Sequence, residues 1–177
     1  MGNFFELIGA SFVRSHGYGT RFPFNFVVRP IDNGFIDKLV REARSSNGSG
    51  VISKKNSIRK IVKCLKKNET VAILMDQNQV REEGVFVDFF GRKACTTPVV
   101  SLLALRTGAA VLPAFAVREA PGKIKIVVQE EVPVISSGNR KSDTIHYTQI
   151  FTTIIEEFVT KYADQWFWVH NRWKTRP

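Results

Sequence analysis

The stretch ETVAILMDQN, residues 69–78, decides the fold of this chain. Its centre, TVAILM, is a continuous apolar run without polar alternation, as expected of a strand that is buried on both faces. Strands of this kind belong to parallel sheets that helices cover on both sides. The run ends in the polar triplet Asp76-Gln77-Asn78, and polar groups at the carboxyl ends of such strands are the first place to look for a binding site.

The segments around this strand alternate between strand and helix patterns. FNFVVRP (24–30) is β-branched and aromatic and ends at a proline, and Val51-Ile52 is a second short strand. Apolar spacing and capping residues predict helices over about 3–15, 33–45, 56–67, 97–106 (with Thr97 as the N-cap) and 142–162, and a strand pair around the turn Ala120-Pro121-Gly122-Lys123. This order predicts an α/β fold with a mostly parallel central sheet flanked by helices.

The length and composition of the chain fit one domain. The 177 residues, of which 44% are hydrophobic, are enough for a real core, so we expect residues 1–177 to form a single domain. Cys64 and Cys95 lack the spacing of a zinc site or of a disulfide framework. A reducing compartment is the simplest interpretation of these two cysteines.

The charge of the chain favours an anionic partner. Its formal net charge is +10, from 26 Lys and Arg residues against 16 Asp and Glu residues. Such an excess attracts nucleic acid, acidic carrier proteins or anionic lipid surfaces, and charge alone does not choose among them. No stretch reaches the roughly 20 apolar residues that a spanning helix needs, so we expect the chain as given to be soluble or peripheral.

The final stretch, QWFWVHNRWKTRP (165–177), combines three tryptophans with Arg172, Lys174, Arg176 and, if it is protonated, His170. One interpretation is a terminal segment that folds over the core with its rings buried and its charges outward. A second is an interfacial belt, with indole rings at headgroup depth and cations on phosphates. Interleaved aromatic and basic residues also suit single-stranded nucleic acid, but no nucleic-acid signature accompanies them.

Two basic features are candidates for anion binding. Arg29, at the end of a predicted strand, could hold a phosphate or a carboxylate with two hydrogen bonds, or it could pair with Asp32 or Asp37. The basic helix 56–67 is either a solvated face or a docking patch for an acidic partner. No histidine has a carboxylate at catalytic spacing, and no GxSxG, P-loop or HExxH motif occurs.

The order of these segments resembles that of a known family. GNFFELIG, VVRPIDNGFIDKLV, ETVAILMDQN, GVFVDFFGRKACTTP, LRTGAAVLPAF and QWFWVHNRWKTRP follow one another as in the lipid A biosynthesis acyltransferases, the late acyltransferases of lipopolysaccharide assembly. The resemblance covers essentially the whole chain and implies a glycerolipid-acyltransferase-like α/β fold. It implies transfer of an acyl chain from acyl carrier protein to an anionic lipid A precursor at the cytoplasmic face of the inner membrane. No cofactor and no nucleic acid are implied.

The resemblance also assigns roles to particular residues. The family signature, His-x-Gly-Asn-aromatic-Glu, pairs a histidine base with a carboxylate. Gly2-Asn3 matches its Gly-Asn, which puts the histidine upstream of Met1. Glu6 takes the carboxylate position, one residue further from that histidine than usual; the alternative phase places Phe5 there. Arg29, Asp76 and Arg92 match residues expected to bind or shape the substrate site.

The resemblance further implies that the family's N-terminal part, including a membrane-anchoring helix, precedes this sequence. We therefore expect an N-terminally truncated chain with little or no acyltransferase activity of its own. Two rival functions stay open: an acyltransferase of the same superfamily that acts on another glycolipid, and a non-catalytic protein that binds a membrane or a carrier.

Overall fold

The computed structural model describes residues 24–28, 34, 38, 50–53 and 57–177. Within them the chain is a mixed α/β protein. The elements, in order, are β1 (Phe24–Val28), β2 (Gly50–Ser53), α2 (Ser57–Lys66), β3 (Thr70–Ala72), the 3₁₀ turn η1 (Arg81–Glu83), β4 (Val85–Phe89), β5 (Arg92–Thr96), α3 (Val99–Thr107), β6 (Ala114–Ala120), β7 (Lys123–Val128), α4 (Arg140–Lys161) and the 3₁₀ turn η2 (Ala163–Gln165). The helices predicted over 3–15 and 33–45 lie outside the described residues, apart from single positions of the second.

The predicted parallel sheet is confirmed for three strands, in the order β2-β1-β3. The central strand is shorter than its apolar run: β3 pairs with β1 only as far as Ala72. Ile73 and Met75 stay buried after the chain has left the ladder. The apolar pattern therefore marked buried chain correctly, but it overestimated the length of the strand.

The other two strand pairs, β4–β5 and β6–β7, are antiparallel hairpins, so the prediction of a mostly parallel sheet holds for β1–β3 alone. The β6–β7 hairpin was predicted, and Gly122 takes a positive φ of 77° in its turn. The β4–β5 turn consists of Phe90 and Gly91, with φ of 51° and 69°. A two-residue turn with positive φ at both positions matches the twist of an antiparallel pair, which explains a hairpin here.

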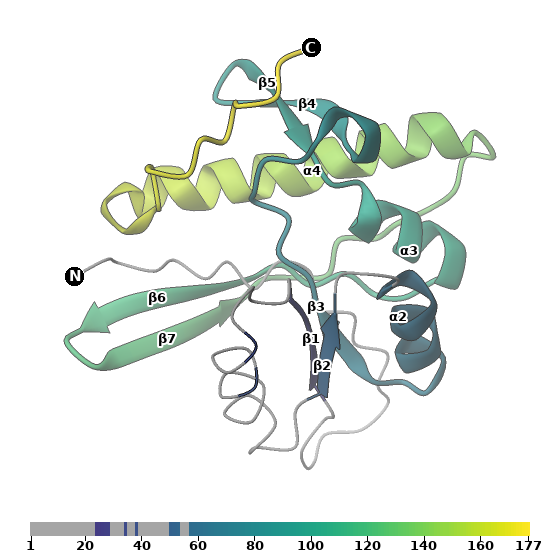
Figure 1. Cartoon of the computed structure of the whole chain (residues 1–177), viewed down its shortest axis with the longest axis horizontal. Coiled ribbons are helices and arrows are strands. Elements are labelled where there is room, and N and C mark those ends of the chain that lie inside the picture. The colour runs from purple at the N-terminus through teal and green to yellow at the C-terminus, as the bar shows by residue number, and fades with distance from the viewer. Residues whose placement is uncertain (1–23, 29–33, 35–37, 39–49, 54–56) are drawn as a thin grey trace.

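Helix α4 covers both hairpins and carries much of the core. The ring of Phe115 on β6 stacks on Phe158 of α4, with centroids 3.7 Å apart. Ser101 of α3 and Thr148 of α4 share a buried hydrogen bond of 2.9 Å. Figure 1 shows α4 lying between the two hairpins, with α2 and α3 toward one end of it.

The helix ends differ slightly from the predicted ones. Asn139 caps α4 by accepting a hydrogen bond from the Ser142 amide. The prediction of Thr97 as the N-cap of α3 is wrong: Pro98 is the N-cap residue, without a side-chain cap, and its carbonyl accepts from the Leu102 amide.

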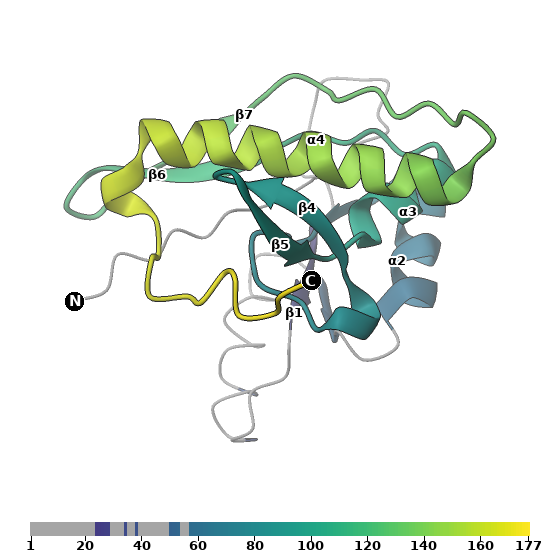
Figure 2. The ribbon, with the colours of Figure 1, turned by 90° about the horizontal axis from the view of Figure 1, so that it is seen from above.

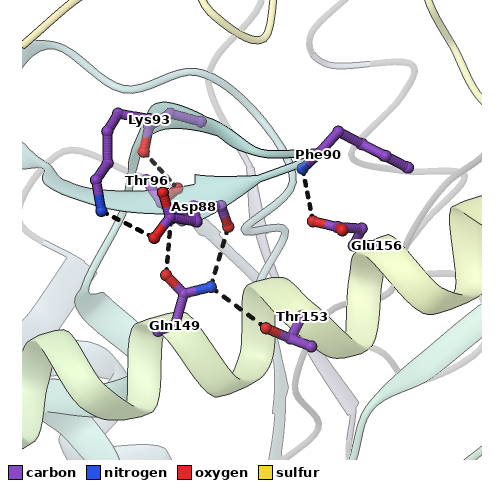
Figure 3. Close-up of polar contacts among 8 residues, drawn as sticks. Asp88, Phe90, Lys93, Thr96, Gln149, Thr153 and Glu156 are labelled. Carbon is purple, nitrogen blue, oxygen red and sulfur yellow. Dashed lines mark hydrogen bonds and ion pairs between the residues drawn. The ribbon is translucent and has the colours of Figure 1, made fainter.

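Side chains of α4 satisfy the backbone edge of β4 (Figure 3). Gln149 accepts from the Asp88 amide at 2.7 Å and donates to the Asp88 carbonyl at 3.0 Å, and Glu156 accepts from the Phe90 amide at 2.6 Å. Gln165 does the same for Arg118 on β6. These contacts fix the β4–β5 hairpin against α4 and the β6–β7 hairpin against η2, and they leave fewer backbone groups open for pairing with another chain.

Candidate functional site

The polar triplet after β3 meets the end of the chain. The Asn78 amide donates to Nε2 of His170 at 2.9 Å. The side chain of Asn78 donates to Oγ1 of Thr175 at 3.1 Å and accepts from the Thr175 amide at 3.0 Å. Two features that stood out separately in the sequence, residues 76–78 and residues 165–177 (the C-terminal segment), therefore form one cluster. Figure 2 shows this segment running back from the end of α4 beside the β4–β5 hairpin.

Arg172 is the anchor of this cluster. It is only 2% exposed. Its guanidinium donates to the Cys95 carbonyl at 2.9 Å and to Oγ1 of Thr96, and it lies 5.4 Å from the centre of the Phe89 ring. Burial lowers the pKa of Arg172 to about 10, while the charge of Asp76 opposes that shift. The side chain therefore keeps its positive charge at neutral pH, inside the protein.

Asp76 supplies the opposite charge. Its Oδ1 is buried and has no hydrogen-bond partner among the described residues, although the residue as a whole is partly exposed. Burial raises the pKa of Asp76 to about 6, and the positive charge of Arg172 works against this rise. A carboxyl group with a pKa near 6 exchanges protons close to neutral pH, which is common at functional sites.

His170 is neutral in this setting. Burial, and then the charge of Arg172, lower its pKa below the usual 6.5. Because Nε2 accepts from Asn78, the proton of the neutral ring belongs on Nδ1. His170 is therefore not one of the cations of the segment at neutral pH, and it acts as a hydrogen-bond acceptor that holds residue 78.

The rings of the C-terminal segment divide between the two sequence interpretations. Trp166 and Trp173 pack against the buried ring of Phe89, with centroid distances of 6.2 and 5.7 Å, as expected of a segment folded over the core. Trp168 is exposed, as expected of an interfacial ring. The expectation that all charges point outward is wrong, because Arg172 points inward.

The predicted site residues are only partly brought together. Asp76 lies in the cluster. Arg92, the first residue of β5, is exposed, and its guanidinium lies 5.1 Å from the centre of the Trp173 ring, so it borders the C-terminal segment. Glu6 and Arg29 lie outside the described residues.

Sequence reasoning missed Arg172 as a site residue and counted it as one surface cation. The available signal was chemical: a carboxylate after a buried strand needs a cation nearby, and the segment at the chain end supplies several. Asn78 was noted only as part of a polar triplet. Its role depends on partners that are 92 and 97 residues away in the chain.

The site has an unfilled hydrogen-bonding capacity. In the described part of the chain, Oδ1 of Asp76 and Nε1 of Trp173 are the buried side-chain atoms without a partner. Such atoms mark places where a bound group or water completes the hydrogen bonding. The described residues contain no group of three or more His, Cys, Asp and Glu side chains suited to a metal ion.

None of the helices in the described ranges combines the length and the apolar character that crossing a bilayer requires. These features define an α/β protein with a polar, charge-coupled site beyond the carboxyl end of a parallel strand, the usual position of ligand sites in open α/β sheets.

A sequence profile of the bacterial lipid A biosynthesis acyltransferases matches residues 10–175, and the chain belongs to this family. It is 27% identical over 164 residues to a lipid A biosynthesis lauroyltransferase of Escherichia coli K12; this covers 90% of the chain and 51% of that protein. A palmitoleoyltransferase of the same organism is 28% identical over 157 residues (88% and 49%). A lipid A biosynthesis acyltransferase of Haemophilus influenzae is 28% identical over 169 residues (96% and 51%). The chain thus spans about half the length of these curated relatives.

Proposed function

We propose that this chain is part of an acyltransferase that transfers a fatty acyl group from acyl carrier protein to a hydroxyl of a lipid A precursor. Membership of the family and the names of its relatives support the reaction class. The observation that carries the proposal is the pair of Asp76 and Arg172 beyond β3, whose opposite charges interact and in which the buried Oδ1 of Asp76 has no partner among the described residues.

The cluster suits a supporting role in this reaction. Arg172 is buried and therefore does not bind substrate directly; it holds the C-terminal segment and favours the ionised form of Asp76. Asp76 is proposed to orient a group of the site through its free oxygen. Arg92, at the border of the segment, is proposed to contact an anionic part of the acceptor.

The remaining roles belong to residues before and just after β1 that lie outside the described ranges. Glu6 is proposed to orient a histidine base, which removes the proton of the acceptor hydroxyl as that oxygen attacks the thioester carbonyl. Arg29 is proposed to bind an anionic group of the substrate. No cofactor is proposed, and the acylated carrier is the second substrate.

The proposed partners are anionic. Helix α2 presents four exposed cations, Arg59, Lys60, Lys63 and Lys66, and exposed Lys67 follows its last residue. This face is proposed to receive the acidic carrier protein. The place of reaction is proposed to be the cytoplasmic face of the inner membrane, where the lipid acceptor is available.

The experiment that tests the proposal is a transfer assay with acylated carrier protein and a defined lipid A precursor, followed by mass spectrometry of the product. It is run with the longest reading frame of the gene that contains these 177 residues, and with the 177 residues alone. The longer protein is expected to add one acyl group. Failure of the longer protein to do so contradicts the proposal, and transfer to another glycolipid instead identifies the first rival function.

The 177 residues alone are expected to show little or no transfer, because the proposed base is not among them. Transfer by these residues at the rate of the longer protein would contradict that expectation while supporting the reaction class.

A further inference from the structure

Four apolar side chains gather at one exposed place, which we call the apolar tip: Phe90, Phe167, Trp168 and Val169. Their exposed fractions are 36%, 44%, 53% and 85%. The rings of Phe90, in the β4–β5 turn, and Trp168 lie 6.3 Å apart, so two segments of the chain contribute to the same surface. Exposed apolar side chains that lie next to one another mark interaction sites more often than scattered ones do.

The fold holds this tip outward. The Trp168 indole donates to the Ala163 carbonyl at 2.7 Å, and its amide donates to the Trp166 carbonyl at 2.9 Å. The His170 amide donates to the Phe167 carbonyl at 3.1 Å. Buried Trp166 and buried Arg172 fix the chain on either side. The tip therefore cannot turn into the core without breaking these contacts.

The surroundings of the tip are partly apolar and carry charges of both signs. Gln165, next to the tip, binds the backbone of Arg118 on β6, and Arg118 lies opposite Ile124, which is 59% exposed. Lys161 ends α4, and Lys123, the first residue of β7, pairs with Glu119 at 2.9 Å. Glu156 of α4 accepts from the Phe90 amide of the tip. Figures 1 and 2 both show the turn of the β6–β7 hairpin and the end of α4 at the same end of the molecule.

We propose that the apolar tip inserts into the interfacial layer of an anionic membrane. Tryptophan and phenylalanine rings favour this layer, and the net charge of the chain, +10, favours anionic headgroups. This role for the tip rests on the proposed function, because a lipid-linked acceptor lies in such a membrane surface. The tip would bring the site beyond β3 to its acceptor, independently of any other anchor.

The test is co-sedimentation of the 177-residue chain with vesicles of phosphatidylcholine mixed with phosphatidylglycerol, and with vesicles of phosphatidylcholine alone. The chain is expected to bind the mixed vesicles more strongly. Trp168→Ser combined with Val169→Ser is expected to weaken this binding about tenfold or more. Val169→Ser alone, which removes no side-chain hydrogen bond, is expected to weaken this binding less. The matched control is Ile135→Ser, which removes an apolar side chain whose exposed fraction (73%) lies between those of Trp168 and Val169. Ile135 lies near the other end of α4, and the change is expected to leave binding unchanged.

Fluorescence gives a second measurement. Brominated lipids in the mixed vesicles are expected to quench the emission of Trp168, so Trp168→Phe is expected to lose the quenched fraction while it keeps vesicle binding. Equal binding by the double variant and the unaltered chain, or no binding by the unaltered chain, would overturn the proposal. So would a concentration-dependent dimer that the double variant abolishes, since a second copy would then cover the tip.

The failure of this inference and that of the proposed function are distinguishable. In the longer protein, the double variant is expected to retain transfer to an acceptor dissolved in detergent and to lose transfer to the acceptor in vesicles. Equal loss in both conditions would contradict a membrane role for the tip, and absence of transfer by the unaltered protein would contradict the function without touching the vesicle result.

Discussion

One carboxylate oxygen of Asp76, Oδ1, is buried and has no hydrogen-bond partner among the described residues. Burial opposes ionisation, and the charge of Arg172 compensates only in part, so the pKa is about 6 instead of the ordinary 3.8. At neutral pH the ionised carboxylate therefore costs stability. An acidic side chain kept at such a cost is more often used for binding or catalysis than for folding.

Asp76→Asn is expected to show this cost directly. Because the folded-state pKa lies above the unfolded one, the folded protein binds more protons between these values, and stability falls as the pH rises through the window from 3.8 to about 6. The unaltered chain is expected to lose on the order of 2–3 kcal/mol relative to Asp76→Asn between about pH 4 and about pH 7. Urea unfolding at several pH values measures this difference. Parallel stability curves for the two proteins would contradict the assignment.

Among the cations, Arg172 is expected to contribute most to the stability of the folded chain. Arg172→Met removes the guanidinium that donates to the Thr96 hydroxyl and to the Cys95 carbonyl, which then keeps only the Gln79 amide, and is expected to cost about 3 kcal/mol or more. Arg172→Lys keeps the charge but loses one donor and is expected to cost about 1–2 kcal/mol. Arg106→Met, at an exposed cation on α3, is the control and is expected to change stability by less than about 0.5 kcal/mol. Equal effects at 106 and 172 would contradict the buried role of Arg172.

At the scale of elements, the stability of α4 depends on the side-chain cap at its first turn. Asn139→Ala removes the acceptor for the Ser142 amide and is expected to lower the free energy of unfolding by about 1 kcal/mol. Asn139→Asp keeps an acceptor, adds a favourable charge at the helix start, and is expected to change stability little. Thermal unfolding of both variants checks this, and equal losses would show that the cap does not act through its side-chain oxygen.

Helix α2 is expected to contribute to binding rather than to stability. Lys60→Glu combined with Lys63→Glu is expected to weaken binding of acyl carrier protein about tenfold or more, with little change in unfolding, because both lysines are exposed. Isothermal titration at low and high salt measures this, with Arg140→Glu and Lys141→Glu on α4 as the matched pair. Equal weakening by the two pairs would indicate that only net charge matters.

The elements differed in how far they could be predicted. The β1–β3 strands and α2, α3 and α4 follow from local patterns, because apolar spacing reports burial. The β4–β5 hairpin was not predicted as a strand pair, since β5 reads RKACT, which is polar at one end and buried at the other. Its turn also uses Phe90 at a positive φ, a conformation that the residue type does not announce.

At the scale of the whole molecule, the site could not be derived from local patterns. Arg172 binds Thr96 and Cys95, which precede it by 76 and 77 positions in the chain. Asn78 binds His170 and Thr175, which follow it by 92 and 97 positions. Such pairings depend on how the last segment crosses the β4–β5 hairpin, which no spacing in the sequence encodes. Asp76 was identified from the sequence because it follows a buried strand. Arg172 was identified only from the structure, in which the C-terminal segment packs beside the residues that follow β3.

The assembled molecule therefore combines a buried polar site, a basic helix and an exposed apolar tip. These three surfaces fit, respectively, a reaction site, an acidic carrier and an anionic lipid surface, the three components that the proposed transfer requires. The central claim among them is that the cluster beyond β3 serves acyl transfer and not folding alone.

The measurement that tests this claim most directly is the transfer rate of Asp76→Asn in the longer protein, compared with its stability. We predict a variant that is at least as stable as the unaltered protein at neutral pH but that transfers acyl groups about a hundredfold more slowly. A variant that transfers at the unaltered rate would contradict the claim, because the cluster would then serve only to stabilise the fold.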